Sequence, residues 1–554
     1  MEHILSAVQR ESWNEALDLF IEYTKTHELD ENLCIIGATI LEYFNDRNSL
    51  FDLIQTGLRF NYHNYELYLL LGNFYRTDNS NKALLSYENA LYYAKKHGPD
   101  EDVQAIEAII DDFNEKEKPS VNKTSIVVIY YEGKDFLERC IDSIRTTCFE
   151  QCYDLLCIDV SDFEKRAEII NESIKSLNEQ NDILLLSSDV MMMPNALFSL
   201  RMALYDKNDV GACSAVSNCA FFYQMPEERT IQNPKEAFEF SAVNNIPSEF
   251  PYESKCVIDG ACLLIKNEVK DKVFPLDDSL LSDRGQYTDI GLKVISNGYK
   301  NYVCWNSFVY RFIRESMLKK NTPYQDRDKE KIQDKWGFYA DYYLNMRREP
   351  IKMIREDNEA VLDILEVGAG LGSTLARIKY LYPHANIKGI ELVENVAEMA
   401  SNYMNMECGN IETYSFGEDE KYDYIVFADV LEHLVDPYSL VDRLKKNLKS
   451  DGCIIASIPN IMNAKVIYDL LRGNFEYQDS GVLDRTHLRF FTKKEVKKLF
   501  EERGYEIVEM SSLKSLTDNT DSYNAFFDKL LAIEEVADKE QFDTFQYVVC
   551  AKVI

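Results

Sequence analysis

The sequence predicts a multidomain protein in which an all-α helical-repeat N-terminus is followed by two α/β domains. Its 554 residues suffice for three or four domains at roughly 100–200 residues each. The N-terminal stretch follows helix-period patterns and has no proline before Pro99. Two series of apolar strands that alternate with amphipathic helices come next, one from Thr124 and one from near Val361. This alternation is typical of α/β folds.

Composition narrows the functional classes. The net charge of −33 argues against binding to nucleic acid or to an anionic membrane surface. No apolar run approaches the roughly 18–20 residues that span a bilayer, and the N-terminus lacks the pattern of a signal peptide. We therefore expect a cytoplasmic protein. Cys148, Cys152 and Cys157 form the one close group among thirteen cysteines, and without a CxxC or a nearby histidine they are expected to be buried thiols.

The N-terminal helices carry one specific pattern. Small and aromatic residues recur on two successive helices, namely Tyr68, Leu71, Gly72 and Tyr75, then Ala83, Tyr87 and Ala90. This pattern resembles a tetratricopeptide repeat, in which a small residue lets two helices pack closely. Residues 1–118 are therefore expected to form a TPR-like helical domain. It would either offer a groove for a protein or peptide partner, or serve as a helical cap or dimerisation module.

A polar segment, NEKEKPSVNK at 114–123, has the composition of a linker. The β-branched and apolar runs that follow predict strands at 124–131, 153–160 and 182–190. We expect a parallel sheet that binds ligands at its carboxyl edge, in a domain spanning 119–335. A second α/β domain with a C-terminal extension is expected over 336–554, and its last run, FQYVVCAKVI, is expected to return to the sheet.

The second series holds a glycine turn. The strand DILEV runs directly into GAGLGSTLARIKYLY, which places glycines at 368, 370 and 372. Glycines at such a turn allow a ligand to approach the start of the helix closely. Glu391 ends the next strand about twenty residues later, where a carboxylate can accept hydrogen bonds from ribose hydroxyls.

With its neighbours, this turn resembles the class I S-adenosylmethionine (SAM)-dependent methyltransferases, which have a Rossmann-like fold. The motifs are LEVGAGLGS, GIEL, FADVLEHL, LKSDGCIIASIPN and DRTHLRFFT, in that order across roughly 340–511. The resemblance implies that SAM is the cofactor. It also implies that nine residues surround SAM: Glu366, Gly368, Gly370, Gly372, Glu391, Asn410, Ile411, Asp429 and Val430.

Two histidines in these motifs are candidate general bases. Methyl transfer to a hydroxyl benefits from a base whose pKa lies near neutrality, which suits histidine. His487, in the segment DRTHLRFF that closes over the pocket in relatives, is the preferred base, and His433 is the second candidate. The sequence thus favours O-methylation.

The first α/β series resembles the family 2 glycosyltransferases, which have a GT-A fold. Its motifs are TSIVVIYYEGKDFLERCIDSI, CIDVSD, LLLSSDVMMMPNAL, VGACSAVSN, VIDGACLLIK and TDIGLKVISNGYK. The resemblance implies that Asp159, Asp189 and Asp259 bind a nucleotide-sugar donor. It also implies that Asp189 holds a divalent cation, Mn or Mg, as the last residue of a DxD-like motif that begins at Ser187. Carboxylate oxygens suit such ions.

One departure concerns the acceptor base. Relatives carry a Glu-Asp pair where this chain has Gln286 and Tyr287. Either Asp289 or the nearby Asp283 substitutes for the missing base, or the domain binds sugar without transferring it. Loss of a general base typically costs about 10²–10⁴ in rate.

These resemblances together predict a bifunctional glycan-modifying enzyme. It would transfer a sugar from a nucleotide-sugar donor to a glycan or glycoprotein acceptor and methylate the product, in bacterial surface-glycan or flagellin glycosylation. The alternative is a methyltransferase whose glycosyltransferase-like and repeat domains only bind glycan or a protein partner.

Overall fold

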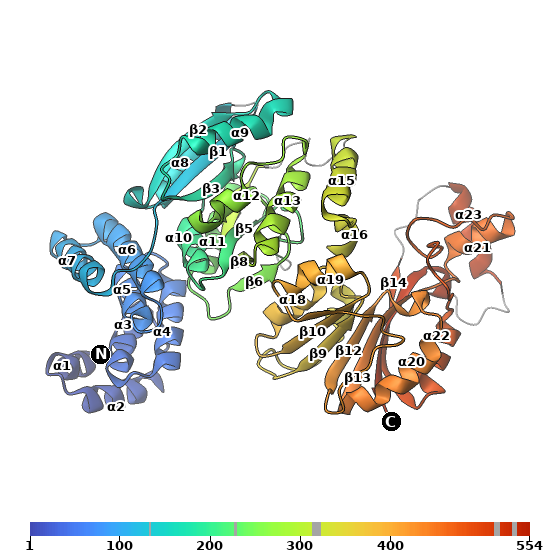
Figure 1. Cartoon of the computed structure of the whole chain (residues 1–554). Coiled ribbons are helices and arrows are strands. Elements are labelled where there is room, and N and C mark those ends of the chain that lie inside the picture. Colours follow the sequence, from blue (N-terminus) through green and yellow to red (C-terminus); the bar gives the residue numbers. More distant parts are fainter. Residues whose placement is uncertain (132–133, 227–229, 313–322, 515–520, 534–539) are drawn as a thin grey trace. The chain divides into compact units, whose positions relative to one another are not determined.

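A computed structural model describes residues 1–131, 134–226, 230–312, 323–514, 521–533 and 540–554. The chain separates into two compact units, Met1–Trp336 and Gly337–Ile554, which are described one at a time (Figure 1). In the described part of the chain, no helix combines the length and the apolar character needed to cross a membrane.

The first unit begins with seven helices and no strand before Thr124. Asp30, Asp46, Asn64 and Asn79 each accept a hydrogen bond from a first-turn amide, and these N-caps fix where four of the helices start. The helices are α1 (Glu2–Gln9), α2 (Trp13–Thr24), α3 (Glu31–Phe44), α4 (Arg47–Phe60), α5 (Tyr65–Tyr75), α6 (Ser80–His97) and α7 (Asp100–Glu117).

The last helices of this region pack closely on one another. The pattern from Tyr68 to Ala90 lies on α5 and α6, as the sequence predicts. A Cβ atom on Gly72 would lie 2.2 Å from the ring of Tyr87, so glycine is what allows the two helices to approach. The helical N-terminus expected from the sequence is therefore confirmed.

The helical region is also joined to the α/β part of the same unit through buried polar contacts. The side chain of Asn195 accepts a hydrogen bond from the Tyr93 hydroxyl at 2.8 Å and lies 2.9 Å from the Tyr68 hydroxyl. Arg201 forms an ion pair with Glu88 at 2.8 Å, and Arg201 is 5% exposed. These contacts place α6 against the α/β part, as a helical cap would lie.

The α/β part of the first unit is built on an eight-stranded sheet of order β2-β1-β3-β7-β5-β8-β4, with β6 paired to β8. The strands are β1 (Thr124–Tyr130), β2 (Tyr153–Asp159), β3 (Asp182–Ser187), β4 (Val190–Met191), β5 (Val210–Ser217), β6 (Tyr252–Lys255), β7 (Cys262–Ile265) and β8 (Lys300–Arg311). The helices are α8 (Lys134–Thr147), α9 (Arg166–Lys175), α10 (Ala196–Leu204), α11 (Pro234–Asn244), α12 (Lys270–Val273), α13 (Asp283–Ser296) and α15 (Pro323–Trp336).

The expectation of a parallel sheet is only partly correct. Strand β1 runs parallel to β2 and β3, but β7 runs antiparallel to both of its neighbours, β3 and β5. The apolar pattern of residues 262–265 predicts a strand but does not fix its direction, which its pairing with β3 and β5 sets. The sheet is consequently mixed.

The second unit carries a seven-stranded sheet of order β11-β10-β9-β12-β13-β15-β14. Its strands are β9 (Asp363–Val367), β10 (Asn386–Glu391), β11 (Met406–Cys408), β12 (Tyr422–Ala428), β13 (Leu448–Pro459), β14 (Tyr505–Lys514) and β15 (Thr544–Val553). Its helices are α16 (Ala340–Tyr343), α17 (Arg348–Ile351), α18 (Ser373–Leu381), α19 (Glu394–Ser401), α20 (Pro437–Leu444), α21 (Ala464–Leu471), α22 (Lys493–Glu501) and α23 (Asp521–Leu531).

Two cores cover the two faces of this second sheet. Successive residues of a strand point to opposite faces, so Ile364 packs with Ile351 of α17 and Ile378 of α18, while Leu365 packs with residues of α20 and α22. The last strand, β15, pairs antiparallel with β13 and β14, which confirms the predicted return of the C-terminal run. Because β9 pairs in parallel with both β10 and β12, the carboxyl ends of these three strands lie side by side.

We expect Gly72→Val to destabilise the first unit by about 1–3 kcal/mol, because the added side chain overlaps the Tyr87 ring in a well-packed core. Urea unfolding of the full chain measures this change. Gln104→Val introduces the same side chain at an exposed position of α7 and serves as the matched control. Equal unfolding midpoints for the two variants would contradict the close packing of α5 on α6.

Candidate active site

A cavity of about 420 Å³ opens at the carboxyl ends of β9, β10 and β12 in the second unit. Six parts of the unit contribute to its wall: the stretch before β9, the glycine turn with the end of β9, the segments after β10, β11 and β12, and Thr486. Ligands of open α/β sheets bind at this edge. Among the predicted residues, those that line the cavity are Glu366, Gly368, Gly370, Glu391, Asn410, Ile411, Asp429, Val430 and His433.

The glycine turn forms the inner wall of the cavity. Gly368, Gly370 and Gly372 all have positive φ, at 69°, 54° and 74°, in the region where a side chain is strained. A Cβ on Gly370 would also lie 2.8 Å from the carbonyl oxygen of Tyr343. That carbonyl accepts a hydrogen bond from the Leu371 amide at 2.9 Å, so the stretch before β9 is tied to the turn. Gly372 shapes the turn as the residue before α18 but does not line the cavity.

Glu391 links the turn to the end of β10. One carboxylate oxygen accepts a hydrogen bond from the Gly370 amide at 2.9 Å, and the other accepts one from the Val393 amide at 3.0 Å. Glu391 is only 5% exposed, yet it lines the cavity. A carboxylate fixed in this way can still accept further hydrogen bonds from a ligand, since each oxygen has two lone pairs.

Glu366, on β9 just before the glycine turn, has a carboxyl whose pKa is strongly raised. Burial raises the pKa of its carboxyl from 4.5 to about 8, and hydrogen bonds from the Thr374 hydroxyl and the Leu375 amide oppose the rise. One of its oxygens has no hydrogen-bond partner among the described residues. A cationic ligand group in the cavity would therefore be bound more favourably by the ionised form of Glu366.

Asp429 directly follows β12 and has a positive φ of 57°. Its carboxylate accepts a hydrogen bond from the Ser457 hydroxyl at 2.7 Å and forms an ion pair with Arg347 at 2.6 Å. The side chain of Gln546 on β15 also donates to it. Residues from three other parts of the unit thus hold this carboxylate at the cavity wall.

The sequence did not point to several residues of this wall. Four further residues of the wall come from α16 and the segment after it: Tyr342, Tyr343, Asn345 and Arg347. The signal that could have located them is the aromatic and basic run ADYYLNMRREP at 340–350, upstream of β9.

The two candidate bases lie next to each other but differ in their access to the cavity. Their ring centroids are 4.7 Å apart. His433 lines the cavity, whereas His487 is 8% exposed and does not line it; its neighbour Thr486 does. Burial lowers the pKa of His487, and its Nδ1 lies 3.0 Å from the carbonyl of Val482. Glu432, on the turn Leu431–His433, is 1% exposed beside them, and burial raises the pKa of its carboxyl.

A comparison with known families agrees with this geometry. Residues 338–510 match the family described as methyltransferase domain. The C-terminal part of this chain is a class I SAM-dependent methyltransferase domain. SAM is the methyl donor of this domain. The glycine turn, Glu391 and Asp429 line the cavity described above.

Two methyltransferases are similar in sequence to part of this chain, over 213 and 122 residues. The chain is 25% identical to the ubiquinone biosynthesis O-methyltransferase of Neisseria meningitidis over 213 residues, which is 34% of this chain and 88% of that protein. It is 28% identical to the malonyl-[acyl-carrier protein] O-methyltransferase of Acetivibrio thermocellus over 122 residues, 22% of this chain and 43% of that protein. A crystal structure of a SAM-dependent methyltransferase from Aquifex aeolicus covers 41% of this chain and 98% of its own, with 14% identity and a TM-score of 0.27.

The acids expected to bind a nucleotide sugar lie in the first unit. Asp159 ends β2 and is exposed, with Oδ1 accepting a hydrogen bond from the Ser161 amide at 2.9 Å. Asp189, by contrast, is fully buried between β3 and β4. Its Oδ2 accepts a hydrogen bond from Nε of Arg311 at 3.2 Å, because β4 pairs with β8 and sets Val190 opposite Arg311. An internal cation therefore already lies beside the carboxylate expected to hold Mn or Mg.

Asp259 is held by the backbone in the same region. Its two oxygens accept hydrogen bonds from the amides of Phe221 and Ala261, both at 2.8 Å, and burial raises the pKa of its carboxyl while Arg311 lowers it. The next residue, Gly260, makes room for Tyr287, whose ring would lie 2.1 Å from a Cβ at that position. Tyr287 is thus a packing residue of this core.

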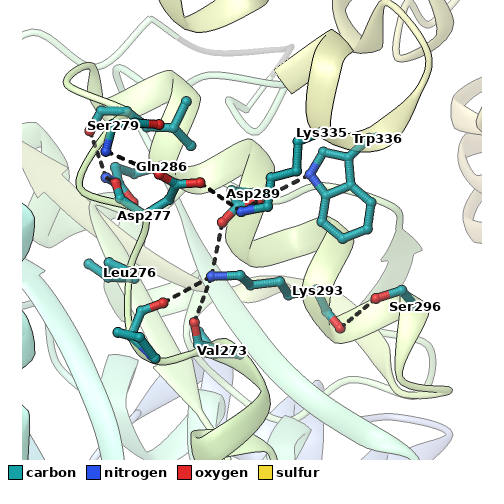
Figure 2. A network of polar contacts seen from close by, with 12 residues as sticks. Val273, Leu276, Asp277, Ser279, Gln286, Asp289, Lys293, Ser296, Lys335 and Trp336 are labelled. Atoms are coloured by element: carbon teal, nitrogen blue, oxygen red, sulfur yellow. Dashed lines mark hydrogen bonds and ion pairs between the residues drawn. The ribbon is translucent and has the colours of Figure 1, made fainter. Parts of the chain in front are cut away.

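Asp289, the remaining candidate base, contacts two lysines and a tryptophan (Figure 2). Lys335 contacts one oxygen at 2.8 Å, Lys293 contacts the other at 3.0 Å, and the Trp336 indole donates a hydrogen bond at 3.1 Å. Asp289 is fully buried, and Gln286 on the same helix donates to the carbonyls of Asp277 and Leu280. The nearby Asp283 is ion-paired with Arg166. Both acids therefore already have cationic partners within the chain.

We expect Glu391→Ala to weaken SAM binding at least tenfold, a loss of about 1.4 kcal/mol or more, because the carboxylate both shapes the turn and faces the cavity. Isothermal titration calorimetry with the full chain measures the Kd. The control Glu394→Ala removes an exposed carboxylate at the start of α19. Equal Kd values for the two variants would contradict the role of Glu391.

The pKa of Glu366 predicts a pH dependence of stability. Because its pKa rises from 4.5 to about 8 on folding, the folded chain holds a proton that the unfolded chain loses between these values. This group's stabilising effect is complete below about pH 4.5 and is lost as pH rises to about 8. Glu366→Gln should therefore gain stability relative to wild type across this window and level off above it, measured as urea unfolding at several pH values. Parallel stability curves would refute the shift.

Proposed function

We propose that this protein uses SAM to methylate a hydroxyl group, and that its N-terminal unit binds a glycan or protein partner without transferring sugar. The observation that carries the methylation is the 420 Å³ cavity with its glycine turn, Glu391 and Asp429. The proposal of an oxygen acceptor is supported by two histidines beside this cavity and by relatives whose names describe O-methyltransferases.

Three features of the first unit support binding without transfer. Arg311 lies against Asp189, where a metal-dependent glycosyltransferase would need an open carboxylate. Asp289 is surrounded by Lys335, Lys293 and Trp336, as Figure 2 shows. The helical region is fastened to the α/β part by buried contacts, which favours a cap over an independent peptide-binding module.

The second candidate function is the bifunctional enzyme, in which the first unit transfers a sugar that the second unit methylates. The order of its six motifs and the placement of Asp159 at the end of β2 favour this possibility. Tethering the two activities would raise the effective concentration of the intermediate product.

We expect the full chain to be stabilised by SAM in thermal unfolding, by RT ln(1 + [SAM]/Kd), and to release no nucleoside diphosphate from UDP-, GDP- or dTDP-sugars with Mn²⁺. The reason for the second expectation is that Asp189 and Asp289 are both paired with internal cations. Turnover that is lost in Asp289→Asn and kept in the exposed control Asp278→Asn would instead establish the bifunctional enzyme.

Comparing native surface glycans with and without this protein tests whether the methyl acceptor is a glycan. Mass spectrometry of surface glycans from a strain without this protein would show a sugar that has lost its methyl group if the acceptor is a glycan. An unchanged glycan would direct the search to a protein or small-molecule hydroxyl.

A further inference from the structure

We infer that Glu432, His433 and His487 bind a divalent transition-metal ion at the edge of the SAM cavity, where the ion contacts the acceptor hydroxyl. This inference rests on the proposed O-methylation for its role, but the metal site itself stands on geometry. Within the described part of the chain, the carboxylate of Glu432 and one ring nitrogen of each histidine all lie within 4.8 Å of one another.

Glu432 supplies the independent observation. It is 1% exposed, and neither carboxylate oxygen has a hydrogen-bond partner among the described residues. A buried carboxyl group without a partner is costly in either protonation state, since even the neutral acid must donate its proton to an acceptor. A cation bound between Glu432 and the histidines would remove this cost.

The imidazole of His487 is oriented as a ligand. Its Nδ1 lies 3.0 Å from the carbonyl of Val482, which fixes the proton on Nδ1 and leaves the lone pair of Nε2 free. That Nε2 lies 4.0 Å from an oxygen of Glu432, too far for a hydrogen bond but in the direction of a shared ion. Metal-binding histidines commonly have their second nitrogen bound to a carbonyl in this way.

The backbone holds the two segments of the site together. The carbonyl of Glu432 accepts hydrogen bonds from the amides of Leu488 and Arg489, at 2.8 and 3.0 Å. Ligand atoms of a tetrahedral ion at about 2.1 Å are about 3.4 Å apart, so the present side chains need to move by less than about 1 Å to close on it. Carboxylate and imidazole together suit Zn²⁺, Co²⁺, Mn²⁺ or Fe²⁺ better than Mg²⁺.

The position of the site gives the ion a role. His433 lines the SAM cavity, so the open coordination position faces the space where an acceptor would lie. A metal-bound oxygen has a lowered pKa, so the acceptor hydroxyl would lose its proton to solvent water. The oxygen then forms the new O–C bond as the S–C bond of SAM breaks, with the bonding electron pair remaining on sulfur.

The test uses the tag-free full chain, stripped with a chelator and titrated with Co²⁺. We expect one cobalt ion per chain by elemental analysis, with visible d–d absorption bands. Glu432→Gln and His487→Ala should each weaken binding at least about tenfold. The matched controls Glu398→Gln, an exposed carboxylate on α19, and His384→Ala, a surface histidine whose side chain is 43% exposed, should bind cobalt as wild type does.

SAM binding, measured by calorimetry on the same samples, separates the outcomes. If Glu432→Gln no longer binds SAM because it does not fold, His433→Ala, at a half-buried position, takes its place as the deciding variant. A wild-type chain that binds SAM but no cobalt overturns the metal site and leaves the proposed function standing, as does equal cobalt affinity across all variants. A chain that binds cobalt but not SAM contradicts the proposed function instead.

Discussion

The contact between Glu391 and the amide of Gly370 is the constraint on which the cofactor cavity depends. The turn between β9 and α18 has three residues with positive φ, and the amides of Gly368 and Ala369 donate to the carbonyl of Ile390 on β10. Glu391 supplies a fixed acceptor from the neighbouring strand, while the carbonyl of Tyr343 supplies one for Leu371. The cavity is therefore held from β10 on one side and from the segment before β9 on the other.

The first unit uses its charges in a different way. Two of the acids that motif comparison singles out are paired with cations of the chain itself, Asp189 with Arg311 and Asp289 with two lysines. Buried pairs of this kind need both partners, because a single remaining charge is costly to bury. The same residues that would serve transfer chemistry thus contribute to holding β4, β8, α13 and α15 in place.

Much of the second unit follows from sequence alone, because its determinants are local. The glycines at 368, 370 and 372 and the acid at 391 lie at spacings that strand and helix lengths impose, and the cavity contains three of these four residues. Arg347 and Arg311 could not be predicted, because their partners lie 82 and 122 residues away and meet them only through tertiary structure. The antiparallel β7 was missed for a similar reason, since pattern alone predicts a strand but not its direction.

The buried polar contacts of Asn195 and Arg201 with the N-terminal helices limit where the chain can be truncated. Deleting residues 1–118 would remove Tyr68, Tyr93 and Glu88 from Asn195 and Arg201, and so leave these buried polar groups without their partners in the helices. The phenotype of that truncation would report a damaged first unit and say little about the helices' own task. A cut between Trp336 and Gly337 follows the division between the compact units, and it is the place where the chain can be divided to assign activities to its halves.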